Sequence, residues 1–245
     1  MLNMSHASNL QKERRMQQEI VDYIIEGSAV MLHDPVARHD FLSIFTEATT
    51  DTARGAVIIM HGRGYHPDWP ELVYPLRTGL PDYGWHTLSI QMPVLDNSAS
   101  FYDYLDIREE SYPRIEAAIH FLQQKKIKHI VLLAHSCSVH MAVAWLDRHP
   151  QARIHAFIGV GMGSTDYGQP MLKAFPLEKI NIPVLDIRGE HDYPAVIRNA
   201  PRRLKNMRQA GHPKSAQQIV DDADHYFTQQ GDALLSHVAN WLKTL

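Results

Sequence analysis

A serine lies between small residues at the point where the sequence pattern changes from strand to helix. The apolar run at 130–133 predicts a buried strand, and the pattern at 139–146 predicts a helix. A serine on such a tight turn is presented for nucleophilic attack, as in the nucleophile elbow G-x-S-x-G. Ala134 and Ser138 replace the two glycines and are the next smallest residues, so the turn stays feasible. Ser136 is therefore the candidate nucleophile, which would form an acyl-enzyme.

A carboxylate and an imidazole follow later in the chain, each after an expected strand. Asp192 comes after the strand expected at 182–188, and His225 comes after the one expected at 216–220. An imidazole with an ordinary pKa of about 6.5 can take the serine proton and return it to the leaving group. Asp192 would orient the imidazole and stabilise its charged form. The chain order Ser, Asp, His is the one that this chemistry has in hydrolases with a nucleophile elbow.

Two backbone N–H groups are needed to stabilise the oxyanion of the tetrahedral intermediate. One candidate is Cys137, at the start of the helix that follows the serine. The other would come from the His-Gly loop after the buried strand expected at 55–61, and we select Arg63.

The assignments have alternatives. Cys137 could be the nucleophile, but it lies one residue past the apex of the turn, which favours a small buried residue. Asp186 could be the acid, but it falls within a strand, where a structural carboxylate is expected. With 16 histidines in the chain, His225 could be an ordinary loop histidine, but its place after the last strand favours the base.

Several further residues are candidates for lining the site. His61 and His66 flank the expected oxyanion loop, and we favour structural hydrogen bonds over substrate contact for both. Tyr65 and Trp69 would line an acyl pocket or pack the loop, and His135 is expected to pack in the turn. The full set of possible lining residues is His61, Gly62, Tyr65, His66, Trp69 and His135.

Three segments carry a resemblance to a known fold family. They are VIIMHGRGYHPDWP at 57–70, GWHTLSIQMP at 84–93 and DHYF at 224–227. From about residue 28 to the end the chain resembles proteins of the α/β-hydrolase fold. More closely, it resembles a poorly characterised bacterial family of α/β-hydrolase-like proteins. The resemblance implies an α/β-hydrolase fold and hydrolase chemistry, and it implies no particular substrate.

The expected elements alternate along most of the chain, which predicts an α/β fold with a mostly parallel sheet between helices. Strands are expected near 28–33, 40–46, 55–61, 85–91, 128–134, 154–160, 182–188 and 216–220. Helices are expected near 71–80, 108–126, 138–149, 196–210 and 230–244. The first two strands have no helix between them, so the sheet should start antiparallel. Only about twenty residues separate the strand ending near 160 from the one starting at 182, which leaves no room for a large lid domain.

A further helix is expected at 10–26, ahead of the hydrolase core. We therefore divide the chain into an N-terminal helical extension, 1–27, and an α/β-hydrolase domain, 28–245. The extension is interpreted as a docking helix. Its expected packing face consists of Leu10, Gln17, Ile20, Val21, Ile24 and Ile25.

Composition excludes several classes of function. The net charge of −3 gives no sign of a nucleic-acid partner. The basic run at 198–208 and the acidic run at 103–110 are interpreted as solvated helix faces.

No apolar stretch is long enough for a membrane span, and no spacing indicates a metal or cofactor site. The absence of a signal-peptide pattern favours the cytoplasm; relatives in the resembled family often carry a secretion signal, so a trimmed periplasmic or secreted form is the alternative. The oligomeric state stays open.

Together these features predict a soluble serine hydrolase of the esterase type, acting on a small carboxylic ester or related acyl compound. Two alternatives stay open. The same three residues could pass the acyl group to an alcohol or amine, as an acyltransferase does. The replaced elbow glycines are also compatible with a non-catalytic binding protein of the same fold.

Overall fold

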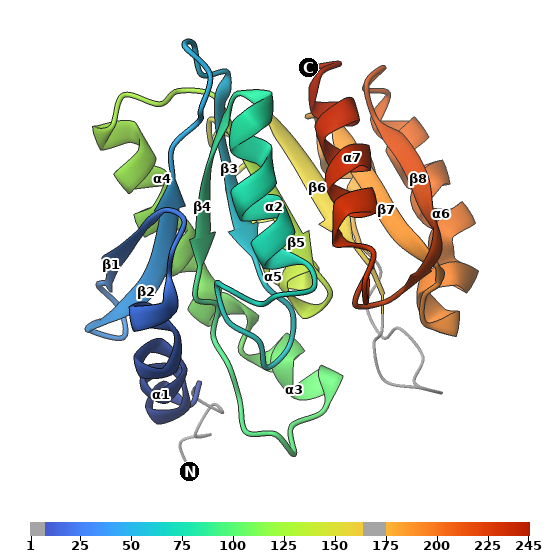
Figure 1. The fold of residues 1–245 in the computed structure, drawn as a ribbon. Helices are drawn as coiled ribbons and strands as arrows, with labels where there is room; N and C mark the ends of the chain where they lie inside the picture. Colours follow the sequence, from blue (N-terminus) through green and yellow to red (C-terminus); the bar gives the residue numbers. More distant parts are fainter. Residues whose placement is uncertain (1–7, 164–174) are drawn as a thin grey trace.

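The computed structural model describes residues 8–163 and 175–245, and within them a single mixed sheet runs through the molecule (Figure 1). Its strand order is β1-β2-β4-β3-β5-β6-β7-β8. The strands are β1 Ser28–Asp34, β2 His39–Thr46, β3 Gly55–Met60, β4 Trp85–Ile90, β5 Ile130–His135, β6 Ala156–Val160, β7 Val184–His191 and β8 Ala216–Asp224. Strand β2 is antiparallel to both neighbours, and all other pairs are parallel, so the antiparallel start is confirmed.

Helices cover both faces of this sheet (Figure 1). The α-helices are α1 Leu10–Ile20, α2 Val73–Gly79, α3 Phe101–Asp106, α4 Tyr112–Gln124, α5 Cys137–Arg148, α6 Pro194–Ala210 and α7 Gly231–Leu242. Short 3-10 helices lie at Val21–Tyr23, Leu80–Tyr83, Arg108–Ser111 and Leu177–Lys179. Helices α2 and α7 pack on one face, and α4, α5 and α6 pack on the other. The predicted α/β architecture, a mostly parallel sheet between helices, is confirmed.

No separate lid domain is present in the described residues, although residues 164–174 of the interval that carried this prediction lie outside them. Within the same described ranges, no helix is long and apolar enough to cross a membrane.

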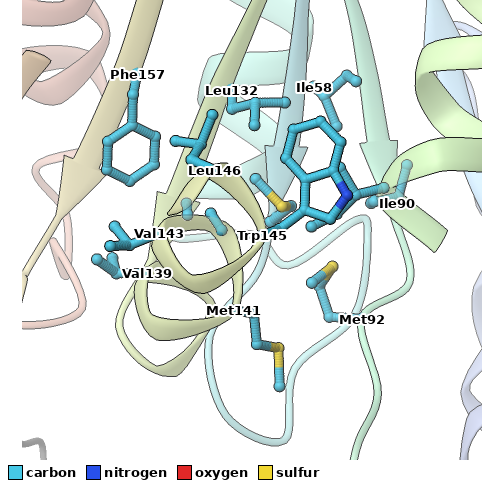
Figure 2. Packing of buried hydrophobic residues seen from close by; sticks show 14 of the residues in the cluster. Ile58, Ile90, Met92, Leu132, Val139, Met141, Val143, Trp145, Leu146 and Phe157 are labelled. Carbon is cyan, nitrogen blue, oxygen red and sulfur yellow. The ribbon is translucent and has the colours of Figure 1, made fainter. Parts of the chain in front are cut away.

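The central strand β5 is buried along its whole length because both of its faces are covered. Its side chains alternate between the two layers of core, with Leu132 facing α5 and Leu133 facing α2 and α7. Figure 2 shows the α5 side, where Val143 and Trp145 pack among side chains from the neighbouring strands. This packing fixes the start of α5 against the end of β5, which is where Ser136 lies.

The helix expected at 108–126 divides into two parts. A 3-10 helix occupies Arg108–Ser111, and α4 follows with Pro113 in its first turn. Proline is suited to this position because it has no N–H to donate, and its fixed φ suits a helix start. Helix α3 was not expected. It begins at a capping box in which Ser100 accepts from the Asp103 N–H, so part of the acidic run caps a helix.

The packing face expected for the N-terminal helix is correct in part: Leu10, Gln17, Ile20, Val21 and Ile24 are partly buried, whereas Ile25 is exposed. Helix α1 ends at Ile20, and Ile25 beyond it is 87% exposed. The residue that α1 buries is Glu13, whose carboxylate accepts from Arg114 Nη1 at 2.9 Å and from Nη2 at 3.2 Å. The Val94 N–H also donates to Glu13, at 3.3 Å. A bidentate guanidinium offsets the cost of burying the carboxylate, so α1 docks through an ion pair.

Glu13→Ala should lower the free energy of unfolding by about 3 kcal/mol, because it removes the bidentate carboxylate of buried Arg114 and leaves the longer contact of Nε with Asp34, at 3.8 Å. Urea unfolding followed by circular dichroism measures this loss. The double variant Glu13→Met/Arg114→Met should lose less than the single one, since it leaves no buried guanidinium without its bidentate partner, and Asp34 keeps the Val36 and Ala37 N–H donors. A loss for Glu13→Ala as small as that for Glu109→Ala, in an exposed pair with Arg148, would contradict the assigned role of Glu13.

Candidate active site

Ser136 occupies the turn between β5 and α5, with φ +59° and ψ −121°. A positive φ is costly for a residue with a side chain, and such strain gathers at functional sites. The Ser136 N–H donates to the Val160 carbonyl at 2.9 Å, which ties the turn to the end of β6. The side chain is only 3% exposed. The local geometry is thus that of a nucleophile elbow, although the flanking glycines are replaced.

The loop after β3 approaches this turn closely. A Cβ atom added to Gly62 would lie 2.6 Å from His135 Nδ1 and 3.2 Å from Ser136 Cβ. Only glycine permits this approach without a shift of the neighbouring groups. The loop that holds Arg63 therefore lies against the segment that holds Cys137, the first residue of α5. The two expected oxyanion donors come from adjoining segments, and their function stays a prediction.

The predicted acid and base are paired. His225 Nδ1 lies 2.6 Å from Asp192 Oδ1, and both side chains are buried. A proton shared with the carboxylate sits on Nδ1, which leaves Nε2 as the basic nitrogen. Within the described residues His225 Nε2 is buried and makes no hydrogen bond. This arrangement suits a general base, since Nε2 has no hydrogen bond and is available to accept a proton.

The end of β6 brings the paired residues close to the serine turn. A Cβ atom added to Gly161, next to the Val160 that bonds Ser136, would lie 2.8 Å from the His225 ring. The same atom would lie 3.4 Å from Asp192 Oδ2. Ser136 and His225 form no hydrogen bond here; in unliganded enzymes such bonds often tighten only when substrate binds.

Asp186, the alternative acid, has a different environment. It lies within β7 and accepts from Arg203 Nε at 2.8 Å and from Gln217 Nε2 at 2.6 Å. It therefore forms a buried ion pair between the sheet and α6. Arg203 belongs to the basic run that was expected to be solvated; for this residue the expectation is wrong, because it is buried against Asp186.

His61 is a structural histidine. Its Nδ1 donates to the Gly62 carbonyl at 2.8 Å, and its Nε2 accepts from the Met92 N–H at 2.9 Å. Burial lowers the pKa of His61 to about 3, so the ring is neutral at physiological pH. His66 accepts from the Asp68 N–H through Nδ1, and burial lowers its pKa as well. The His66 ring bonds within its own loop, and the His61 ring joins its loop to the segment after β4; structural hydrogen bonds were the interpretation favoured from the sequence.

His135 contacts the loop of the predicted base, His225. Its Nε2 donates to the His225 backbone carbonyl at 3.0 Å, and the two rings lie 4.9 Å apart. Burial lowers the pKa of His135 well below its ordinary value, with the nearby His225 acting in the same direction. A neutral His135 can hold the loop of His225 without placing a second positive charge beside the imidazolium.

A cluster of aromatic rings lies beside His225, which Tyr193 and Tyr226 contact directly. Tyr65 stacks on Trp69 at 3.9 Å, and Tyr226 meets both rings edge to face. The Tyr193 and Tyr226 hydroxyls share a hydrogen bond at 2.8 Å, and the Tyr193 ring lies 4.7 Å from that of His225. Tyr193 and Tyr226 were missed from the sequence. The available signal was that each directly follows the acid or the base.

A metal ion could be held elsewhere. Within the described parts of the chain, Glu190, His191 and Asp222 place potential ligand atoms within 4.8 Å of one another. All three residues are exposed, and none belongs to the group around Ser136.

A family model matches almost the whole chain, over residues 5–105 and 103–244. The chain belongs to the DUF3530 family. Its description reads "Protein of unknown function (DUF3530)", so membership assigns no activity. No curated protein matches the sequence. For this DUF3530 protein, any statement of activity must therefore come from its fold and from the geometry of its site.

Solved structures similar to the DUF3530 protein include hydrolases of the α/β fold, and this similarity confirms the predicted α/β-hydrolase fold. An esterase from Pyrococcus furiosus has a TM-score of 0.68 at 16% identity, with 91% of this chain and 92% of that chain covered. A dienelactone hydrolase from Anabaena variabilis has a TM-score of 0.66 at 17% identity, with coverages of 89% and 97%. An α/β serine hydrolase without lid from Xanthomonas campestris has a TM-score of 0.62 at 14% identity, with coverages of 90% and 95%. At these identities the similarity establishes the fold.

Proposed function

We propose that this DUF3530 protein is a serine hydrolase that cleaves a carboxylic ester or a related acyl compound. Ser136 is the nucleophile, His225 the general base and then the general acid, and Asp192 the residue that orients the base. The observation that carries the proposal is the 2.6 Å His225–Asp192 bond beside a serine held at φ +59°. The names of two structural neighbours, a serine hydrolase and an esterase, support the same reaction class.

The reaction would proceed in two halves. Ser136 Oγ attacks the acyl carbonyl while His225 Nε2 takes its proton, and the charge on the imidazolium is balanced by Asp192. The backbone N–H groups of Cys137 and Arg63 would donate to the oxyanion, and the start of α5 adds a favourable dipole. His225 then returns the proton to the leaving alcohol. Water attacks the acyl-enzyme with the same base and releases the acid.

A fluorophosphonate probe tests the proposal because it reacts with activated serines and not with ordinary ones. We expect labelling of the wild-type protein at Ser136, identified by peptide mapping. Ser136→Ala should not be labelled, whereas Ser111→Ala, which removes a buried hydroxyl at the start of α4, should still be labelled at Ser136. An unlabelled wild-type protein with a normal unfolding transition would contradict the proposal and favour a non-catalytic binding protein.

A further inference from the structure

Ser138 stands where the elbow pattern usually has its second glycine, and its side chain makes a specific contact. The buried hydroxyl donates to the backbone carbonyl of His61 at 2.5 Å. The bond joins α5 to the loop after β3, across 77 positions of the chain. A glycine at this position has no side chain with which to make the bond.

The two ends of this bond lie close in sequence to the two expected oxyanion donors. Ser138 directly follows Cys137, and His61 lies two positions before Arg63. The distance between two donors fixed on different elements depends on what joins those elements. The Ser138–His61 bond joins them directly.

A second anchor holds the same loop from the other side. The His61 ring accepts from the Met92 N–H, which belongs to the segment after β4, and donates to the Gly62 carbonyl. The His61 peptide is thus fixed through its ring on one side and through its carbonyl on the other. Without the Ser138 hydroxyl, the loop would keep the His61 ring anchor and the bond from Arg63 Nη1 to the Ala99 carbonyl, but it would lose its direct bond to α5.

We propose that Ser138 is a positioning residue, whose hydroxyl sets the separation between the Cys137 and Arg63 N–H groups in the oxyanion hole. This inference rests on the proposed serine-hydrolase function. Its physical basis is that oxyanion stabilisation requires preorganised donors, and small misplacements of such groups are costly in rate. The loss of one elbow glycine is in this view compensated by a new contact.

The test compares 4-nitrophenyl acetate with its thiono analogue, in which sulfur replaces the carbonyl oxygen. Sulfur accepts hydrogen bonds more weakly than oxygen, so a well-formed oxyanion hole favours the oxygen ester. Ser138→Ala and Ser138→Gly should both lower kcat for the oxygen ester by about tenfold, with KM little changed. In the same two variants, the ratio of kcat/KM for the oxygen ester to kcat/KM for the thiono ester should also fall, because the oxygen ester depends more on the oxyanion hole. Ser138→Thr, which keeps a hydroxyl, should restore the ratio.

Ser111→Ala is the matched control. Ser111 is also buried, and its hydroxyl donates to the Arg108 carbonyl at the start of α4. This variant should leave the ratio at the wild-type value, and thermal unfolding of all variants reports whether each is folded. An unchanged ratio in folded Ser138→Ala and Ser138→Gly overturns the role of Ser138 alone. A wild-type protein without turnover or fluorophosphonate labelling overturns the serine-hydrolase proposal, and this inference with it.

Discussion

His225→Ala should lower kcat for 4-nitrophenyl acetate by at least about 10⁴-fold, because it removes the group proposed to take the Ser136 proton. The structure gives the reason: His225 Nε2 is the ring nitrogen left free of hydrogen bonds, while Nδ1 is held by Asp192. Ser136→Ala should cause a loss of the same order. The double variant should be little worse than either single one, since residues that act as one unit are not additive. Steady-state kinetics on the purified variants measures all three.

His191→Ala is the matched control for this loss. His191 lies one residue before Asp192, but its side chain is exposed and it has no contact with Ser136 among the described interactions. Its removal should leave kcat within about twofold of wild type, as expected for a surface residue away from the site. Near-normal hydrolysis by folded His225→Ala would remove His225 from the mechanism.

The residues expected to do chemistry were predictable because each follows a strand. Parallel strands bring their carboxyl ends to one edge of the sheet, so residues directly after β5, β7 and β8 are gathered at that edge (Figure 1). The apolar run before Ser136 marked one such strand clearly. The ends of β7 and β8 were less clear, because both strands continue through polar residues and pair across an irregular register near Gly189. Their lengths depend on pairing, which a local pattern does not contain.

Contacts between distant residues were not predictable from local patterns. Glu13 and Arg114 are 101 positions apart, and an acidic residue on an amphipathic helix ordinarily indicates a solvated face. The Ser138–His61 bond is similar, since the sequence shows a replaced glycine and not the carbonyl that the new hydroxyl meets. In both cases a polar residue is buried because a partner from another element satisfies it. Periodicity locates the elements, and such pairings decide how they dock.

Asp192→Asn and Asp186→Asn should give opposite results, which separates the two candidate acids. An amide at position 192 cannot hold the proton on His225 Nδ1 or stabilise the imidazolium, so kcat should fall by about 10⁴-fold with the fold retained. An amide at position 186 removes the charge that balances buried Arg203, so stability should fall by about 3 kcal/mol. In the fraction that stays folded, Asp186→Asn should retain kcat, because Asp186 contacts Arg203 and Gln217 and not His225.

The measurement pairs urea unfolding with steady-state kinetics on both variants, at a temperature where each is folded. If folded Asp186→Asn lost kcat while Asp192→Asn remained active, the role of the acid would pass to Asp186. The geometry opposes that outcome: the guanidinium of Arg203 already neutralises the Asp186 carboxylate within the sheet–α6 interface. The Asp192 carboxylate has no such cation among the described residues, and its bond to His225 is the contact through which its charge can act on the imidazolium as that forms.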